Sequence, residues 1–432
     1  MKSIKICVIG LGYVGLPLAR LFSTKYPVVG FDINKARVES INSGIDTTLE
    51  IDDITLKKSL VSKMPGLNEK GLFCTCCLKD VKDCSVFIVT VPTPVDKHNK
   101  PDLTPLIKAS EAVGKLISVG DVVIYESTVY PGVTEEECLP VIERVSNLKF
   151  NEDFFAGYSP ERINPGDKEH TVEKIKKVTS GSTLEIANFV DNLYNSVLVN
   201  GTHKASSIKV AEASKIIENA QRDVNIAFMN ELAKIFNVMG IDTNDVIEAA
   251  SSKWNFIRLK PGLVGGHCIS VDPYYLIQKA QVYGYLPRIM SDARRLNDGM
   301  GDYVAHQVID LMNKKGIMVK DAKILILGVT FKENCPDIRN TKVVDIYNTL
   351  SEFTPNIVIY DPWANPEAVK KEYGISIKSL DLDAQENAFD VVVLAVAHDA
   401  FKNKNVRLFL KGQGVVFDVK NVLPKEMVDA RL

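Results

Sequence analysis

The sequence predicts an α/β protein in which two doubly wound domains are joined by a long central helix and a helical middle domain. Three observations carry this prediction. Buried-strand patterns alternate with helical patterns near the start of the chain, the same alternation returns near its end, and a long helical stretch lies between them. Such alternation is typical of crossover units in a largely parallel sheet. Because 432 residues exceed one ordinary core, we expect three domains, at residues 1–200, 201–310 and 311–432.

The first domain begins with a short apolar strand, a helix and a second strand, expected at residues 4–9, 14–22 and 28–32. Further apolar runs with the length of buried strands lie at residues 86–91, 122–125 and 154–158. The strand pattern returns in the last part of the chain at residues 324–327, 357–360, 391–396 and 415–419. This return predicts a second domain of the nucleotide-binding α/β type.

The middle of the chain contains one long helical pattern. Residues 206–239 include no proline or glycine, and their apolar side chains recur with a helical period. The resulting helix is longer than the usual three turns. Its period leaves more apolar surface than one flanking domain would cover, so we expect a homodimer with this helix in the interface.

Composition and charge exclude several classes of protein. The 46% hydrophobic and 25% charged residues are typical of a globular chain, and 52 basic against 54 acidic residues leave a net charge of -2. We therefore expect neither nucleic acid nor an anionic membrane as a partner. No apolar run reaches the roughly 20 residues needed to span a bilayer.

The cysteines and the N-terminus bear on the compartment. Eight unevenly spread cysteines form no small-domain disulfide framework, so we expect a reducing cytoplasm. Residues 2–21 have the basic start and apolar stretch of a signal peptide, but their glycines fit another template better. Cys74, Cys76, Cys77 and Cys84 lack the paired spacing and nearby histidines of a zinc site, so we expect no metal.

The glycines near the N-terminus form a dinucleotide-binding fingerprint. Gly10, Gly12 and Gly15 follow a strand and open a helix, which is the context that a Rossmann-like domain requires. The first glycine makes the tight turn, the second lets the backbone approach a pyrophosphate, and the third lets helix pack on strand. Asp32, at the end of the second strand, would accept from ribose hydroxyls and repel a 2′-phosphate. We therefore expect NAD, rather than NADP, as the cofactor.

A second motif ends a glycine-rich loop with a cysteine. Gly265, Gly266, His267 and Cys268 are followed four residues later by Asp272. Glycines let the backbone approach a ligand closely, and a thiolate is a strong nucleophile. Together with a hydride acceptor, such a thiol predicts oxidation through a covalent thioester. The alternative is that Cys268 is only a small buried hydrophobe. His267 is a poor candidate for its base because adjacent side chains usually diverge.

Lys215 and Asn219 are spaced four residues apart on the long helix and so share one face. They are either a solvated surface pair or, as the small and apolar neighbours suggest, a buried pair. An ammonium and an amide aimed at one point would stabilise a developing oxyanion.

With these motifs the chain resembles the UDP-glucose/GDP-mannose dehydrogenase family, the nucleotide-sugar 6-dehydrogenases, over essentially its whole length. Besides the glycine fingerprint and the Lys215 and Cys268 segments, the resemblance rests on Val91-Pro92-Thr93-Pro94, Glu126-Ser127-Thr128-Val129, Ser159-Pro160-Glu161-Arg162, Gly328-Val329-Thr330-Phe331-Lys332, Asp337-Ile338-Arg339 and Tyr360-Asp361-Pro362. It implies a four-electron oxidation of a sugar C6 hydroxymethyl group to a carboxylate, with two NAD consumed per turnover.

The resemblance also implies roles for particular residues. Cys268 is the nucleophile that traps the C6 aldehyde, and Lys215 and Asn219 hold the C6 oxygen. Asp272, Glu161 and Thr128 position and activate water. The fingerprint residues expected on NAD are Gly10, Gly12, Tyr13, Val14, Gly15 and Asp32, with Thr93 and Thr128 along its nicotinamide half. Lys332 and Arg339 meet the diphosphates in an interdomain cleft, Lys332 on the substrate and Arg339 on the cofactor, while Glu161, Lys215, Asn219, Gly265 and Gly266 contact the substrate.

The residues around the cysteine loop indicate which substrate within this family to expect. Lys253-Trp254-Asn255-Phe256 and Val271-Asp272-Pro273-Tyr274-Tyr275 look like the branch acting on UDP-N-acetylhexosamines. We expect UDP-N-acetylglucosamine, with UDP-N-acetylmannosamine, the galactosamine epimer or UDP-glucose as alternatives, and a product that feeds surface polysaccharides. Two other readings are a two-electron 3-hydroxyacid or 6-phosphogluconate-type dehydrogenase, which needs no cysteine, and a catalytically silent nucleotide-sensing protein. Counting the NADH formed per sugar separates all three.

Overall fold

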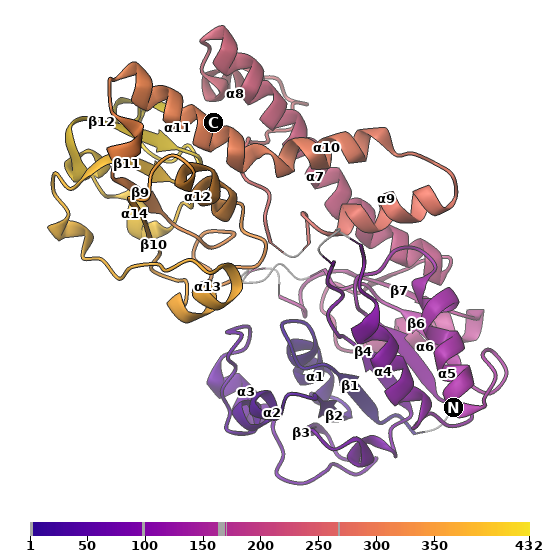
Figure 1. The fold of residues 1–432 in the computed structure, drawn as a ribbon. Helices are drawn as coiled ribbons and strands as arrows, with labels where there is room; N and C mark the ends of the chain where they lie inside the picture. Colours follow the sequence, from indigo (N-terminus) through magenta and orange to yellow (C-terminus); the bar gives the residue numbers. More distant parts are fainter. Residues whose placement is uncertain (1–2, 97–99, 163–168, 170, 267) are drawn as a thin grey trace. The chain divides into compact units, whose positions relative to one another are not determined.

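The computed structural model describes residues 3–96, 100–162, 169, 171–266 and 268–432, so His267 lies outside the described residues. The chain forms two compact units, the first of Met1–Glu218 with Tyr274–Tyr283 and the second of Asn219–Pro273 with Gly284–Leu432. Helix α7 (Ile208–Met239) begins in the first unit and ends in the second (Figure 1). The division into three domains at residues 200 and 310 stays a prediction.

The first unit is built on an eight-stranded sheet with the order β3-β2-β1-β4-β5-β6-β7-β8 among the described residues. Its strands are β1 (Ile6–Ile9), β2 (Pro27–Phe31), β3 (Gly71–Thr75), β4 (Val86–Val89), β5 (Val122–Tyr125), β6 (Phe155–Tyr158), β7 (Lys177–Gly181) and β8 (Thr202–Lys204). The strands β3, β2, β1, β4, β5 and β6, in this spatial order, all run parallel. Ile6 of β1 lies opposite Val28 of β2 on one side and Val86 of β4 on the other. Only the β6–β7 pairing is antiparallel within this sheet as described. The expected largely parallel sheet is confirmed.

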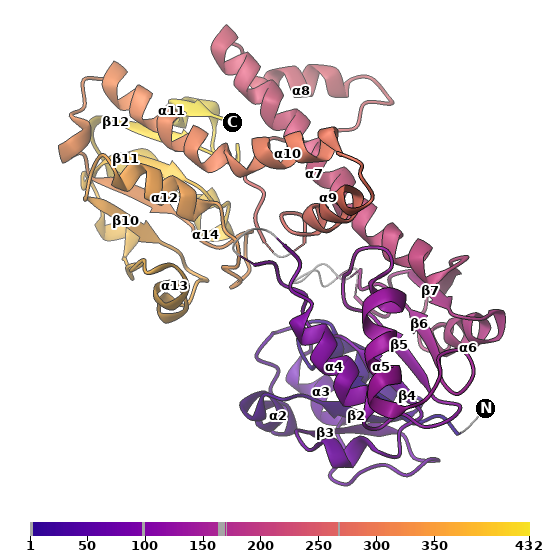
Figure 2. The same cartoon turned by 45° about the vertical axis from the view of Figure 1, so that its right-hand side comes forward.

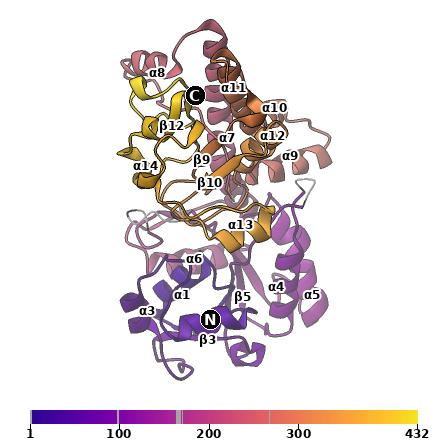
Figure 3. The ribbon, with the colours of Figure 1, turned by 60° about the vertical axis from the view of Figure 1, so that its left-hand side comes forward.

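Helices cover both faces of this sheet. They are α1 (Gly15–Ser23), α2 (Lys35–Asn42), α3 (Asp53–Ser59), α4 (Thr104–Gly114), α5 (Leu139–Ser146) and α6 (Leu184–Asn195), with the short turns η1 (Leu78–Val81) and η2 (Thr134–Cys138). Alternate residues of a strand point to opposite faces. Ile6 and Val8 therefore join the core under α1, α3 and α6, whereas Cys7 and Ile9 join the core under α4 and α5 (Figures 2 and 3).

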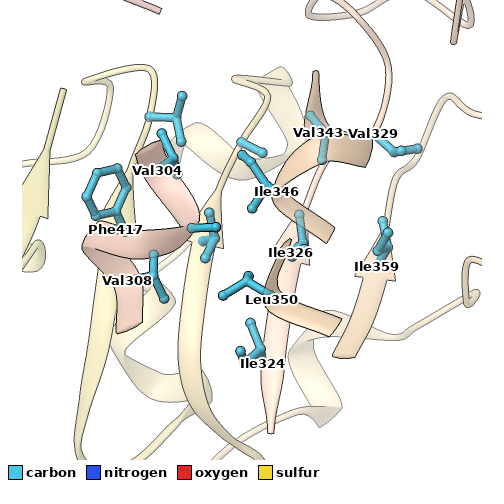
Figure 4. Close-up of a cluster of buried hydrophobic side chains, with 14 of the residues drawn as sticks. Val304, Val308, Ile324, Ile326, Val329, Val343, Ile346, Leu350, Ile359 and Phe417 are labelled. Atoms are coloured by element: carbon cyan, nitrogen blue, oxygen red, sulfur yellow. The ribbon is translucent and has the colours of Figure 1, made fainter. Parts of the chain in front are cut away.

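The second unit contains a five-stranded sheet with the order β10-β9-β11-β12-β13. Its strands are β9 (Ile324–Leu327), β10 (Ile357–Tyr360), β11 (Phe389–Leu394), β12 (Leu410–Asp418) and β13 (Ala430–Arg431), all parallel to their neighbours. Helices α11 (Met300–Lys314) and α12 (Val343–Ser351) pack on one face, where Val304, Val308, Ile346 and Leu350 meet Ile326 of β9 (Figure 4). The remaining elements of this domain are η3 (Val319–Asp321), α13 (Pro366–Tyr373), η4 (Leu382–Ala384), α14 (Asp399–Lys402), η5 (Val406–Phe409) and η6 (Lys425–Met427). The return of the strand pattern does mark a second α/β domain.

The middle of the chain is helical, as expected. Besides α7 it consists of α8 (Thr243–Ser251), α9 (Asp272–Val282) and α10 (Arg288–Asp298). Helix α7 has 32 residues, which confirms the single long helix. Lys215 and Asn219 are both buried on it, which excludes the solvated surface pair.

Candidate active site

The loop after β1 has the geometry of a phosphate-binding turn. Gly10 adopts a φ of 94°, which side-chain-bearing residues rarely tolerate, and its N–H donates to the Phe31 carbonyl at 2.8 Å. A Cβ on Gly15 would lie 1.8 Å from the Gly10 carbonyl oxygen, whereas a Cβ on Gly12 would meet nothing within 4 Å. The space above Gly12 is therefore open to a ligand. Val14 makes no side-chain cap hydrogen bond at the start of α1, and the start of a helix favours a bound anion such as phosphate.

Asp32 stands beside this loop at the end of β2. Its carboxylate accepts from the Leu11 N–H at 2.7 Å and the Asn34 N–H at 2.8 Å, and its side chain borders a cavity of about 460 Å³. The cavity is lined by Ile9, Gly10, Phe31, Asp32, Ile33, Val91, Pro92, Asp102, Thr104, Pro105, Lys108, Ala109 and Ala112. An apolar pocket with a carboxylate at its rim suits an adenine ring and its ribose. The residues of the first unit thus fit a dinucleotide, and Tyr13 and Val14 lie in the same loop.

Thr93 and Thr128 are brought together in the first unit. The Thr93 hydroxyl donates to the Thr128 carbonyl at 2.7 Å, and the Ser127 hydroxyl donates to the Val91 carbonyl at 2.6 Å. Two loops that follow the parallel strands β4 and β5 are therefore bound to one another. Ligands gather at this carboxyl end of an open parallel sheet.

Glu161 and Lys215 are also brought together. The Lys215 ammonium lies 3.9 Å from the Glu161 carboxylate, and both side chains are nearly buried. Sequence reasoning assigned both residues to the substrate but did not anticipate this pairing. A partly desolvated ammonium beside a carboxylate is arranged to orient a hydroxyl group and to take part in proton transfer.

A buried ion pair that the sequence did not reveal supports these loops. The Lys177 ammonium lies 2.6 Å from the Glu126 carboxylate, both fully shielded from solvent, and it also donates to the Pro160 carbonyl at 3.2 Å. The Tyr194 hydroxyl donates to the other Glu126 oxygen at 2.5 Å. Glu126 directly precedes Ser127 and Thr128, and Pro160 directly precedes Glu161. One charge pair thus reaches both the loop that carries Thr128 and the loop that carries Glu161.

Glu212, one turn before Lys215 on α7, fastens the helix to the segment that follows Thr128. Its carboxylate accepts from the Gly132 N–H at 2.6 Å and the Thr134 N–H at 2.9 Å. Burial raises the pKa of Glu212 to about 7, although these hydrogen bonds oppose the shift. This role of Glu212 could not be predicted, because a glutamate in a helix carries no sequence signal that distinguishes a buried residue from a solvated one.

The cysteine loop belongs to the second unit. Cys268 is partly exposed, and its carbonyl accepts from the N–H groups of Val271 at 3.1 Å and Asp272 at 2.8 Å. The Asp272 carboxylate is buried and accepts from the Asn219 amide at 2.5 Å. The structure therefore brings Asn219, Asp272 and the Cys268 turn together, and their catalytic roles stay a prediction.

The start of the same loop is held by a buried amide. Asn230 of α7 donates to the Gly262 carbonyl at 3.0 Å and accepts from the Gly262 N–H at 2.8 Å. It also donates to the Asn297 side chain, which in turn donates to the Asp223 carboxylate at 2.7 Å. A polar residue on the buried face of α7 was the available signal for this contact, and sequence reasoning missed it.

The two glycines before Cys268 have close neighbours of their own. A Cβ on Gly265 would lie 2.7 Å from the Asn340 carbonyl oxygen, and a Cβ on Gly266 would lie 2.7 Å from the Phe331 ring. Gly266 also adopts a φ of 84°. Close approach by other residues of the second unit therefore already requires glycine here. The predicted substrate contact of Gly265 and Gly266 stays a prediction.

Lys332 and Arg339 lie in the loop after β9 in the second unit, in the position where nucleotide phosphates are expected. The Arg339 guanidinium forms a forked pair with Asp337, at 3.0 and 3.1 Å from its Nε and 2.5 Å from its Nη2. Asp361, at the end of β10, accepts from four N–H groups of this region and lies 3.1 Å from His398. Burial alone would raise the pKa of Asp361, but His398 and the N–H donors hold it well below its usual range.

All eight cysteines lie among the described residues, and none of them forms a disulfide bond. Five are buried, Cys76 and Cys77 are exposed, and Cys268 is intermediate. Within the part of the chain that the structure describes, no three His, Cys, Asp or Glu side chains gather in a way that would hold a metal ion. None of the described helices is long and apolar enough to cross a membrane.

Three family models match successive parts of the chain. The NAD binding domain of the UDP-glucose/GDP-mannose dehydrogenase family matches residues 4–198, its central domain matches residues 209–299, and its UDP binding domain matches residues 325–425. The first unit therefore carries the NAD binding domain of the family and the second carries its UDP binding domain.

Similar proteins agree with these matches. The chain is 57% identical to the UDP-N-acetyl-D-glucosamine 6-dehydrogenase of Pseudomonas aeruginosa, over 100% of both chains. It is 52% identical to the enzyme of the same name from Salmonella typhi, over 100% of this chain and 99% of that one. A solved UDP-D-ManNAc dehydrogenase from Pyrococcus horikoshii superposes with a TM-score of 0.88 at 29% identity, covering 99% of this chain and 98% of that one. The chain belongs to the UDP-glucose/GDP-mannose dehydrogenase family.

Proposed function

We propose that this protein is an NAD-dependent dehydrogenase that oxidises the C6 hydroxymethyl group of UDP-N-acetylglucosamine to a carboxylate. The observation that carries the proposal is the Cys268 turn, whose neighbour Asp272 is bound to Asn219 in a family of nucleotide-sugar oxidising enzymes. A thiol in this place converts a two-electron alcohol oxidation into a four-electron one, because the aldehyde is trapped and oxidised again.

The choice of sugar rests on the degree of similarity. The Pseudomonas aeruginosa and Salmonella typhi proteins named for UDP-N-acetyl-D-glucosamine share 57% and 52% of their residues with this chain, whereas the Pyrococcus horikoshii UDP-D-ManNAc enzyme shares 29%. The sequence around the cysteine loop favours the same branch, which acts on UDP-N-acetylhexosamines. The product, a UDP-linked uronic acid, supplies enzymes that build surface polysaccharides.

Lys215, Glu161 and Asn219 prepare the alcohol. Lys215, paired with Glu161, and Asn219 hold the C6 oxygen, and Lys215 in its neutral amine form accepts the proton as the alcohol is oxidised. Glu161 and Thr128 then position the water that releases the acid, assisted by Asp272. The buried Lys177–Glu126 pair holds the Thr128 and Glu161 loops in place for these steps.

Cys268 performs the covalent step. Its thiolate adds to the C6 aldehyde to give a thiohemiacetal, and loss of a second hydride leaves a thioester that water hydrolyses. When bound, NAD accepts one hydride in each of the two oxidations. The residues that hold it are Gly10, Gly12, Tyr13, Val14, Gly15, Asp32, Thr93, Thr128 and Arg339, while Lys332, Gly265 and Gly266 contact the UDP-sugar.

The experiment that tests this function is Cys268→Ser. A serine hydroxyl has no comparable anion near neutral pH, and its ester is a poorer acyl donor to water than a thioester, so we expect steady-state acid formation to fall by at least roughly 100-fold. Binding of UDP-N-acetylglucosamine should persist, and a slow first oxidation is compatible with the mechanism. Mass spectrometry of wild-type enzyme quenched during turnover should find a sugar-nucleotide adduct on the Cys268 peptide, with two NADH per sugar.

Cys77→Ser is the matched control, because Cys77 is an exposed thiol of the first unit. It should retain wild-type turnover. Acid formation by Cys268→Ser at near wild-type rate would refute the thioester mechanism, and one NADH per sugar would refute the four-electron reaction.

We further propose a cytoplasmic homodimer. Phe228, Ile235, Val238 and Met239 recur along one face of α7 and are between 46% and 89% exposed, which is unusual for apolar side chains of a long helix. A partner copy would bury them, and eight free cysteines suit a reducing compartment. Light scattering at micromolar concentration should give twice the monomer mass of 47.8 kDa, and a monomer would rule the dimer out.

A further inference from the structure

We propose that Phe331 and Asn340 are positioning residues through which the nucleotide loop, residues 328–341, holds the Cys268 loop, so that UDP binding immobilises the reactive thiol. The inference rests on the proposed function, in which Cys268 attacks C6, Lys332 contacts the UDP-sugar and Arg339 holds the cofactor. It adds a link between these two tasks that neither motif reveals by itself.

The contact between the two loops is direct and lies within the second unit. The Asn340 amide donates to the Gly266 carbonyl at 3.0 Å, and the Ser270 hydroxyl donates to the same oxygen at 2.6 Å. These two bonds fix the peptide that begins the turn around Cys268. The Phe331 ring and the Asn340 backbone occupy the space that side chains at positions 266 and 265 would need. The cysteine loop is thus packed closely against the nucleotide loop at both glycines.

Each contact residue is the chain neighbour of a proposed phosphate ligand. Phe331 precedes Lys332, and Asn340 follows Arg339. The Phe331 N–H donates to the Asp337 carbonyl at 3.1 Å, and Asp337 also holds the Arg339 guanidinium, so the two ends of the nucleotide loop are tied together. Asn340 adopts a φ of 50°, a left-handed conformation that asparagine tolerates better than most residues. Fixing either cation therefore fixes the residue that touches the cysteine loop.

The physical effect of this link is to order the thiol before reaction. Half of the nucleotide loop is at least partly exposed, and its conformational freedom falls when the UDP diphosphate binds Lys332. The glycine loop then loses freedom as well, because the Asn340 hydrogen bond and the Phe331 ring join it to the nucleotide loop. A misplacement of about 1 Å at a reacting group can cost on the order of 100-fold in rate. Binding energy from the nucleotide, far from C6 along the substrate, is used in this way to orient Cys268.

The test compares Asn340→Gly with Asn421→Gly in the full-length protein. Both asparagines have a φ near 50° (50° and 51°), and each forms one side-chain hydrogen bond, Asn340 to Gly266 and Asn421 to Arg431. Glycine keeps the left-handed backbone and removes only that bond. We expect Asn340→Gly to lower kcat on the order of 10-fold while the Kd for UDP stays within about twofold. Asn421→Gly should leave both unchanged.

A second readout follows the thiol itself. The rate at which iodoacetamide alkylates Cys268 is measured by mass spectrometry of its peptide, with and without UDP, while the exposed Cys76 and Cys77 serve as internal references. In the wild type UDP should slow alkylation of Cys268 at least about threefold, and this effect should disappear in Asn340→Gly and in Phe331→Leu. Phe331→Leu keeps an apolar side chain and so provides a second folded variant.

The outcomes separate this inference from the proposed function. If the wild type forms no NADH with UDP-N-acetylglucosamine, the proposed function fails. If the wild type turns over but UDP leaves Cys268 alkylation unchanged, the link between the loops does not exist. If UDP still slows alkylation in Asn340→Gly and Phe331→Leu, the nucleotide shields the thiol by covering it, and the positioning role is refuted.

Discussion

The loop after β1 in the first unit and the loop after β9 in the second share one design but differ in how they use an aspartate. Gly10 and Gly328 have φ values of 94° and 92°, and each donates its N–H at 2.8 Å to the last residue of the neighbouring strand. The N–H of the next residue is then accepted by the aspartate that follows that strand, by Asp32 at 2.7 Å and by Asp361 at 2.6 Å. The two units thus contain the same turn.

The difference lies in what else each carboxylate binds. Asp32 accepts from one further N–H, that of Asn34, and borders an open cavity, so oxygen lone pairs remain for ribose hydroxyls. Asp361 is buried, accepts from three further N–H groups and faces His398. The residue two positions after the first glycine also differs between the two loops. Gly12 is exposed, whereas Thr330 is buried and its hydroxyl donates to the Lys332 carbonyl. The same turn therefore leaves space for a ligand in one unit and forms an internal brace in the other.

The largest effect expected from this comparison is on stability. Asp361→Asn removes a buried negative charge from beside His398 and leaves N–H groups with fewer acceptors, which costs roughly 3–5 kcal/mol. Asp32→Asn, the same change at the matching position, should lower the thermal unfolding midpoint little because Asp32 is partly exposed. Differential scanning calorimetry of the two variants measures the contrast. Equal losses of midpoint temperature would show that both aspartates are braces.

A smaller effect is expected on cofactor choice. Removing the Asp32 charge relieves its repulsion of a 2′-phosphate, so Asp32→Asn should reduce the ratio of kcat/KM for NAD to that for NADP on the order of 10-fold, about 1.4 kcal/mol. Asp361→Asn should leave this ratio unchanged wherever the variant remains folded. An unaltered ratio in Asp32→Asn would mean that Asp32 does not read the ribose.

The smallest effect appears at acid pH. The pKa of Asp361 is lower in the folded protein than its usual 3.8, so its contribution to stability is complete above pH 3.8 and is lost as the pH falls below that value. The stability gap between wild type and Asp361→Asn should therefore stay constant from pH 7 to 5 and narrow below pH 3.8, by roughly 1.4 kcal/mol per unit. Thermal midpoints at pH 7, 5 and 3 provide the measurement. A gap that narrows already between pH 7 and 5 would contradict the depressed pKa.

Much of the fold could be predicted because its elements carry local signals. The strands β1, β2, β5, β9 and β10 are short apolar runs, and α7 is a long stretch without glycine or proline. Strands β3, β7 and β8 were not anticipated, because Thr75, Lys177, Thr202 and His203 interrupt their apolar pattern. Lys177 in particular reads as an exposed residue, and only its tertiary partner Glu126 accounts for its burial.

The candidate site was predictable to a similar degree. Residues in short motifs, such as Gly10, Asp32, Lys215 and Cys268, could be singled out because the chemistry demands those residue types at those spacings. Their supporting partners could not, because Glu126 with Lys177, Asn230 with Gly262, and Asn340 with Gly266 are joined only by the fold. The roles of the motif residues in catalysis and binding remain predictions.

The buried pair of Glu126 and Lys177 has a consequence for how the first unit fluctuates. Freeing the Thr128 loop carries Glu126 away and leaves Lys177 as an uncompensated interior cation, and freeing the Glu161 loop removes the Pro160 carbonyl from the same ammonium. An unpaired buried charge costs several kcal/mol, so opening one loop makes opening of the other easier. The two segments should behave as one cooperative unit in native-state hydrogen exchange, with amides after β5 and after β6 exchanging together rather than one after the other.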